Sequence, residues 1–256
     1  MFDGHGESSV STEPPCALCQ KGEPLRQSHI LPEFLYTSVY DENHRFLQVS
    51  TDPLEPSVSR PKGLYEPMLC SGCETRLSVW ETYASGVLHG GPELRYQMEA
   101  GGFVIRGLDY PRFKLFGMSL LWRAGRSRRP EFDAVSLGVH EERLRRMLDA
   151  EDPGRAADYG FTIVFPPERQ AQELFGQALG PPQRVRYHSH HVYRFLLGVT
   201  IWLFPVSSHM RELDPILFSL SEDGSLRIRN GGQPTLDFLV RFGAEITSAN
   251  RTRGKA

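Results

Sequence analysis

The feature that most constrains the fold of this chain is its four cysteines, which form two Cys-x-x-Cys pairs with none left over. Cys16 pairs with Cys19 and Cys70 pairs with Cys73, and residues 20–69 separate the two pairs. Four thiolates match the tetrahedral shell that Zn²⁺ prefers, with Zn–S distances of ~2.3 Å. The spacing therefore predicts a structural zinc site that joins two distant stretches of chain.

Other uses of the four cysteines stay open from the sequence. Disulfides are disfavoured, because the N-terminus lacks the basic start and apolar run of a signal peptide and the expected compartment keeps thiols reduced. A thioredoxin-like motif would follow a strand within a βαβ unit, which neither pair does. An iron–sulfur cluster also takes four thiolates, and four unrelated thiols are the last alternative. Zinc is favoured over all of these.

Composition limits the class of protein. The chain has 256 residues, of which 39% are hydrophobic, so it can bury a sizeable core. Its 29 basic and 31 acidic residues give a net charge of −2, which excludes binding of nucleic acid by bulk charge. The longest apolar stretch, residues 195–206, is far shorter than the ~20 residues of a membrane-spanning helix. We expect a cytoplasmic protein that does not enter a membrane.

Hydrophobic periodicity predicts the order of the elements. Leu77, Trp80 and Ala84 recur at helical spacing, which predicts a helix over residues 70–88. A short alternating stretch, HRFLQVS, predicts a strand between the cysteine pairs. The other predicted elements are a hairpin over 93–108 turning at Gly101-Gly102, a buried helix over 113–124, a solvent-facing helix over 140–154, strands in FTIVF, RVRYHSH, HVYRFLLGVTIWLF, ILFSL and SLRIR, and a closing helix over 235–249.

Four segments follow from these patterns. We expect a flexible tail over residues 1–15, a zinc-knuckle module over 16–89, a hairpin and helical region over 90–154, and a β-rich region over 155–256. The predicted fold class is α+β, with a metal-clipped front part followed by helices and a mostly antiparallel β-rich part.

The order of motifs in residues 16–89 resembles a known family. Between the cysteine pairs lies Ser28-His29-Ile30-Leu31-Pro32, and Glu74 directly follows the second pair. The order Cys-x-x-Cys, Ser-His-Ile-x-Pro, Cys-x-x-Cys-Glu resembles the zinc-knuckle subgroup of HNH (His-Me finger) endonucleases and bacterial HNH-like proteins. A looser likeness extends over residues 113–154. The resemblance implies a ββα-metal module.

The resemblance also implies roles for three side chains. His29 would be the general base that deprotonates the attacking water, a role that suits an imidazole with a pKa of ~6.5. Glu74 would stand at the second ligand position for one Mg²⁺ or Mn²⁺ ion, which stabilises the leaving oxygen. Glu81, on the same helical stripe, would be a further ligand or a partner of one. The implied activity is metal-dependent hydrolysis of phosphodiester bonds in nucleic acid, with DNA favoured.

The chain departs from the family pattern at three places. Ser28 stands where an acidic residue or His is usual, residues 60–69 contain no Asn, and Glu74 replaces the usual final His. Enzymatic activity is therefore open, and the alternative is a catalytically degenerate zinc module that binds nucleic acid or a protein partner. Glu74 and Glu81 also suit the positive end of a helix without any further role.

A basic segment, residues 106–129, carries seven Lys or Arg residues against one acid. We expect Arg123, Arg126, Arg128 and Arg129 to contact nucleic-acid phosphates, with a solvated loop as the alternative.

The β-rich region contains another cluster, His188, His190 and His191, for which His209 would be a further metal ligand. No acidic residue lies in that immediate segment, so we interpret these as exposed strand histidines. A third hypothesis gives the β-rich region a ligand or partner role, with the zinc part as a structural clip.

Overall fold

The computed structural model describes residues 14–37, 39–48, 58–91, 93–166, 179–187, 190–198, 200–207 and 219–232. Over these ranges the protein is α+β, with three α-helices and a mostly antiparallel sheet, as the sequence predicts. Several predictions fall outside the described residues, namely those for 1–13, most of ILFSL, 235–249, His188 and His209.

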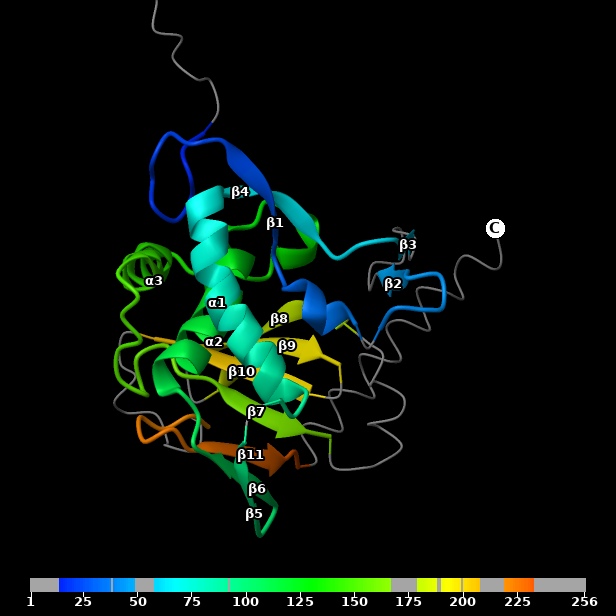
Figure 1. The fold of residues 1–256 in the computed structure, drawn as a ribbon, viewed down its shortest axis with the longest axis vertical. Coiled ribbons are helices and arrows are strands. Elements are labelled where there is room, and N and C mark those ends of the chain that lie inside the picture. Colours follow the sequence, from blue (N-terminus) through cyan, green and yellow to red (C-terminus); the bar gives the residue numbers. More distant parts are fainter. Residues whose placement is uncertain are drawn as a thin grey trace, which may run out of the picture.

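The front part of the chain forms a strand–strand–helix unit. β1 (Leu25–His29) pairs antiparallel with β4 (Tyr65–Cys70), and α1 (Ser71–Leu88) begins directly after β4. The register places Leu25 opposite Cys70. This pairing brings the chain that follows the first cysteine pair against the chain that leads into the second pair (Figure 1).

α1 confirms the predicted helix and its apolar face. Leu77, Trp80, Ala84 and Val87 are buried, at the spacing that places side chains on one side of a helix. Glu74 lies in the first turn, where the helix dipole favours a carboxylate.

Short elements fill the stretch between β1 and β4. A 3₁₀ turn, η1 (Glu33–Tyr36), follows β1 after Pro32. β2 (Phe46–Gln48) pairs antiparallel with β3 (Val58–Arg60), which confirms the strand predicted in HRFLQVS.

A seven-stranded sheet occupies the other part of the described chain. Its strands are β5 (Arg95–Glu99), β6 (Gly102–Arg106), β7 (Thr162–Phe165), β8 (Leu179–Tyr187), β9 (His190–Leu197), β10 (Thr200–Val206) and β11 (Leu226–Asn230). Their order is β5-β6-β11-β7-β10-β9-β8, and every neighbouring pair is antiparallel except β11 with β7. The predicted hairpin over 93–108 is confirmed as β5 and β6, and HVYRFLLGVTIWLF forms two strands that turn at Gly198, where φ is +59°.

α2 (Tyr110–Arg126) lies between the sheet and the other helices. Its N-terminus is capped by Asp109, whose carboxylate accepts a hydrogen bond from the Arg112 amide at 3.0 Å. The stretch predicted as a buried helix, 113–124, is buried throughout. Phe113 packs on Trp202 of β10 with ring centroids 6.1 Å apart, so α2 covers the sheet while contacting α1 and α3 (Figure 1).

α3 (Val139–Asp149) is the solvent-facing helix that the sequence predicts, ending before the Asp152-Pro153-Gly154 turn. Only Leu144 and Leu148 of α3 are buried. A 3₁₀ turn, η2 (Pro130–Phe132), connects α2 towards α3. No helix of the described ranges has the length and apolar character needed to cross a membrane.

Candidate metal centre and the adjoining His29 site

The fold brings the four cysteine sulfurs together. The Sγ atoms of Cys16, Cys19, Cys70 and Cys73 all lie within 4.8 Å of one another, and those of Cys19 and Cys70 are 3.8 Å apart. A tetrahedron with Zn–S bonds of ~2.3 Å has S–S edges of about 3.8 Å. The four residues can therefore hold a metal ion such as Zn²⁺, as the sequence spacing predicts.

Backbone hydrogen bonds explain how the first pair reaches the second. The Cys16 amide donates to the Lys21 carbonyl at 2.9 Å, which closes a tight loop around Cys19. The Ala17 amide donates to the Met68 carbonyl of β4 at 3.0 Å. These bonds fix the first loop against the strand that carries Cys70.

Burial and backbone dipoles act differently on the thiols. Burial raises the pKa of the Cys70 and Cys73 thiols. Burial also opposes ionisation of Cys16, but hydrogen bonds from backbone amides, the Cys70 amide first, outweigh it and lower the pKa of that thiol. A bound cation favours the thiolate form of every ligand, so metal binding would release protons.

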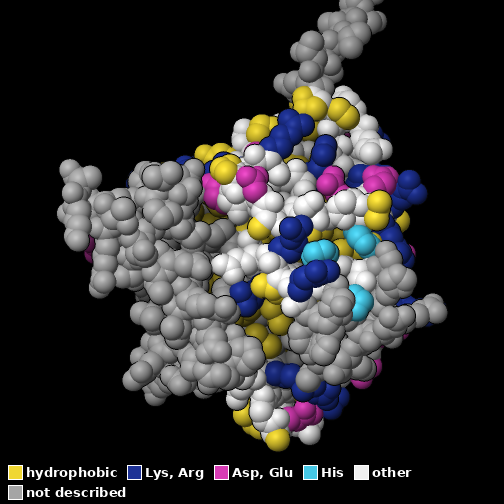
Figure 2. Space-filling model, turned by 180° about the vertical axis from the view of Figure 1, so that it is seen from behind, with side chains coloured by type: hydrophobic (Ala, Val, Ile, Leu, Met, Phe, Trp, Pro, Cys, Tyr) yellow, Lys and Arg dark blue, Asp and Glu magenta, His cyan; other side chains and the backbone are white. Residues whose placement is uncertain are grey.

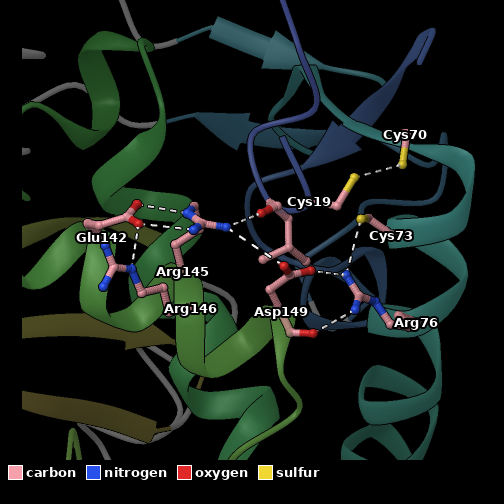
Figure 3. Close-up of polar contacts among 9 residues, drawn as sticks. Cys19, Cys70, Cys73, Arg76, Glu142, Arg145, Arg146 and Asp149 are labelled. Carbon is pink, nitrogen blue, oxygen red and sulfur yellow. Dashed lines mark hydrogen bonds and ion pairs between the residues drawn. The ribbon is translucent and has the colours of Figure 1, made fainter. Parts of the chain in front are cut away.

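Two arginines connect the cysteines to α3 (Figure 3). Arg76 donates to the Cys73 sulfur at 3.3 Å and to the Asp149 carboxylate at 2.9 Å. Arg145 donates to the Leu18 carbonyl at 2.6 Å, inside the first cysteine loop. Sequence analysis missed both residues. The available signal was the position of Arg76 three residues after Cys73, which puts both on one helical face.

His29 ends β1 beside an acidic partner that the sequence analysis missed. Its Nε2 atom is buried and lies 3.0 Å from a carboxylate oxygen of Glu33, without the alignment of a hydrogen bond. Its Nδ1 atom makes no hydrogen bond with the residues that the structure describes, and the side chain is 33% exposed. The sequence signal for Glu33 as a partner of His29 was its position four residues later, directly after Pro32.

Glu74, the predicted ligand of a divalent ion, lies in the first turn of α1. Its half-buried carboxyl has one oxygen, Oε1, that is buried without a hydrogen-bond partner among the described residues. Burial raises the pKa of this carboxyl, while the Ser28 hydroxyl and the charge of Arg123 lower it in part. The charge of His29 has a smaller lowering effect on the same pKa.

Glu81 has a different environment from Glu74. Its carboxylate lies 2.7 Å from Nη1 of Arg123, whose side chain is only 2% exposed. Glu81 therefore compensates the charge of a buried guanidinium. The burial of Arg123 also corrects the expectation that this side chain contacts a phosphate backbone, because it does not reach the surface.

The other three arginines expected to contact phosphate, Arg126, Arg128 and Arg129, lie nearer the surface. Arg126 lies 3.5 Å from Glu141, and Arg129 lies 3.0 Å from Glu131. Arg126 and Arg128 line a groove of about 510 Å³ beside β1 and β4. In the upper part of the face seen in Figure 2, Lys and Arg side chains alternate with Asp and Glu side chains. A phosphate contact through Arg126, Arg128 and Arg129 stays a prediction.

The donor sets differ in what they can hold. Among the described residues, the four cysteines are the one group of three or more close metal-ligand side chains. Glu74 offers a hard oxygen that is buried and unbonded, which fits one ligand of a Mg²⁺ or Mn²⁺ ion whose other positions are filled by water and phosphate. Ser28 is fully buried, and its hydroxyl accepts a hydrogen bond from the Leu69 amide at 3.0 Å. Because a hydroxyl is neutral, Ser28 adds no negative charge for a metal ion beside Glu74.

Comparison with known proteins adds no relative. No protein-family model matches the chain, and neither curated proteins nor solved structures give a match. The likeness to HNH endonucleases therefore depends on the motifs of residues 16–89.

Proposed function

We propose that residues 16–89 form a zinc-stabilised nuclease module that hydrolyses phosphodiester bonds, with His29 as the general base. The observation that carries this proposal is a β1–β4–α1 unit, joined by four close cysteines, that places His29 at the end of β1 and Glu74 in the first turn of α1. Base and metal ligand thus come from different elements of one small unit.

The partner of His29 supports a role in proton transfer. Glu33 occupies the Nε2 side of the imidazole, so Nδ1 is the nitrogen left to accept a proton from water. A neighbouring carboxylate stabilises the imidazolium that forms when the base is protonated. The partial exposure of His29 gives solvent and substrate access to the ring.

Glu74 supports the other half of the proposed chemistry. Its buried, unbonded oxygen would hold a divalent ion, which when bound supplies charge stabilisation to the leaving oxygen. Burial raises the pKa of Glu74, the Ser28 hydroxyl and the charge of Arg123 offset part of that rise, and a bound cation would favour the ionised ligand further.

Plasmid nicking tests the proposal. Supercoiled plasmid is incubated with Mg²⁺ or Mn²⁺ and the full chain, its His29→Ala variant, or its Glu74→Gln variant. We expect both variants to lose activity, by ~10²-fold or more for His29→Ala, the usual contribution of a general base. His89→Ala changes an exposed histidine at the end of α1 and is the matched control. Equal cleavage by wild type and His29→Ala, or no cleavage with either ion, would sink the proposal.

A second candidate is a zinc module that binds nucleic acid or a protein partner without turnover. The ion pair of Glu81 with Arg123 favours this candidate, because it occupies one of the two predicted carboxylate ligands on α1. Only Glu74 then has an oxygen without a hydrogen-bond partner. It predicts salt-sensitive binding of a labelled oligonucleotide and zinc at about one ion per chain. Stoichiometric Mn²⁺ binding that is lost in Glu74→Gln would contradict it.

A further inference from the structure

We propose that Arg123 is a positioning residue of the His29 site, which holds the end of β1 and the middle of α1 in place from inside the protein. The inference depends on the proposed function only in giving His29 a catalytic task. It makes α2, which lies outside residues 16–89, a part of the site.

The contacts of Arg123 join three elements. Its Nη1 atom donates to the backbone carbonyl of His29 at 2.9 Å and lies 2.7 Å from the Glu81 carboxylate. Its Nε and Nη2 atoms donate to the carbonyl and the hydroxyl of Ser119, both at 3.3 Å. A planar guanidinium can make these bonds at fixed angles to one another, which a lysine ammonium cannot.

Burial makes these contacts costly to lose. Arg123 is 2% exposed, so its charge is removed from water and depends on Glu81 for compensation. The neighbouring positions of α2, such as Leu120 and Leu121, are apolar and fully buried. An apolar side chain would be enough for packing alone, whereas Arg123 directs a hydrogen bond at the backbone of the proposed base.

The bond to the His29 carbonyl has a defined mechanical effect. The carbonyl belongs to the last residue of β1, where pairing with β4 ends at Tyr65. A hydrogen bond there restrains the peptide plane and thereby the direction in which the imidazole leaves the backbone. Displacement of a reacting group by about 1 Å is enough to cost ~100-fold in rate.

Variants of the full, zinc-loaded chain test this role. Arg123→Met removes the charge and all the hydrogen bonds, Arg123→Lys keeps the charge, and Arg112→Met alters an exposed arginine of the same helix as the control. Zinc content and the unfolding midpoint establish that each variant is folded. In plasmid nicking, we expect Arg123→Met to lower kcat about 10- to 100-fold with KM little changed, and Arg123→Lys to recover part of the loss.

A second readout does not need nuclease activity. The His29 ring is followed by NMR in ¹³C-histidine-labelled protein, with its signal assigned from its absence in His29→Ala. We expect the ring signal to shift or broaden in both Arg123 variants and to stay unchanged in Arg112→Met. A folded Arg123→Met with wild-type His29 signals overturns the inference, and if that variant does not fold, unchanged signals in Arg123→Lys overturn it. Absence of nicking by the wild type is a failure of the proposed function, and the NMR result still decides the role of Arg123.

Discussion

Buried charges in this protein have partners that differ in kind. Arg123 is paired with a carboxylate, but Lys114, which is fully buried in α2, donates to the backbone carbonyls of Arg155 and Ala156 at 3.1 and 3.0 Å. Burial lowers the pKa of Lys114 to about 7, opposed in part by the charges of Asp158 and Glu222. Carbonyl dipoles orient the amine but compensate its charge less completely than a carboxylate in contact would.

This pKa makes stability depend on pH in a defined direction. The pKa of Lys114 is about 7 in the folded chain and 10.5 as the ordinary value, so the unfolded chain binds more protons between these limits. The contribution of Lys114 therefore makes the free energy of unfolding rise as pH increases above about 7, by up to ~1 kcal/mol per pH unit. Lys114→Met removes this contribution.

Urea unfolding at pH 7, 8 and 9 measures the effect, with zinc present throughout. We expect the wild-type free energy of unfolding to increase more steeply with pH than that of Lys114→Met. Other titrating groups, including the cysteines, contribute equally to both proteins and cancel in the difference. Parallel pH profiles for the two proteins would contradict the assignment.

At the scale of elements, α2 approaches the sheet closely because it has a glycine at the contact. A Cβ atom at Gly117 would lie 2.2 Å from the ring of Phe161, whose ring also stacks on Trp202 at 5.1 Å. Gly117→Ala gains up to about 1 kcal/mol of helix propensity, but overpacking a core typically costs 1–3 kcal/mol, so we expect about 1 kcal/mol of net destabilisation. Thermal unfolding checks this, with Gly72→Ala of α1, where a Cβ meets open space, as the control. A midpoint for Gly117→Ala at or above that of Gly72→Ala would show that Phe161 can move aside.

Elements with a strong local signal could be predicted from the sequence. α1 has apolar residues at helical spacing, α2 contains a stretch that is apolar on nearly all sides, and the β5–β6 hairpin has its turn at Gly101-Gly102. The order of strands could not be predicted, because β11 lies between β6 and β7 through contacts between residues far apart in the chain. Local periodicity contains no information on such pairing.

The parts of the candidate site also differ in how far the local sequence predicts them. The cysteine cluster follows from two short spacings and the absence of any other cysteine. His29 and Glu74 are predicted through a resemblance, and their roles stay predictions. The basic stretch around Arg123 predicts a surface contact with phosphate, but Arg123 is buried. Its burial depends on how α2 packs, and the local sequence contains no information on that packing.

At the scale of the whole molecule, the metal centre and the seven-stranded sheet are stabilised by different contacts. The candidate centre brings four cysteines together and has arginine contacts to α3, while the sheet core contains aromatic side chains such as Phe161, Trp202 and Phe204. Chelation of the metal should therefore affect one part of the protein more than the other.

Hydrogen exchange with and without a zinc chelator measures this difference. On metal removal, we expect amide protection to fall in residues 16–29, 65–89 and 139–149, because no ion then joins the two cysteine pairs and the Arg76 and Arg145 contacts weaken. Residues 190–197 of β9 are the internal control and should keep their protection. A uniform loss over all these segments would mean that the protein unfolds as one unit on metal loss.

The pairing of β1 with β4 closes the stretch of chain between them, so the length of that stretch can change without moving its two ends. The pairing of His29 with Tyr65, together with the cysteines that precede β1 and follow β4, fixes both ends of the intervening stretch. Each doubling of such a closed stretch costs only about 0.6 kcal/mol of chain entropy. An insertion between η1 and β4, which spares Glu33, would therefore leave the geometry of the His29 site intact, even if it were as large as a folded domain.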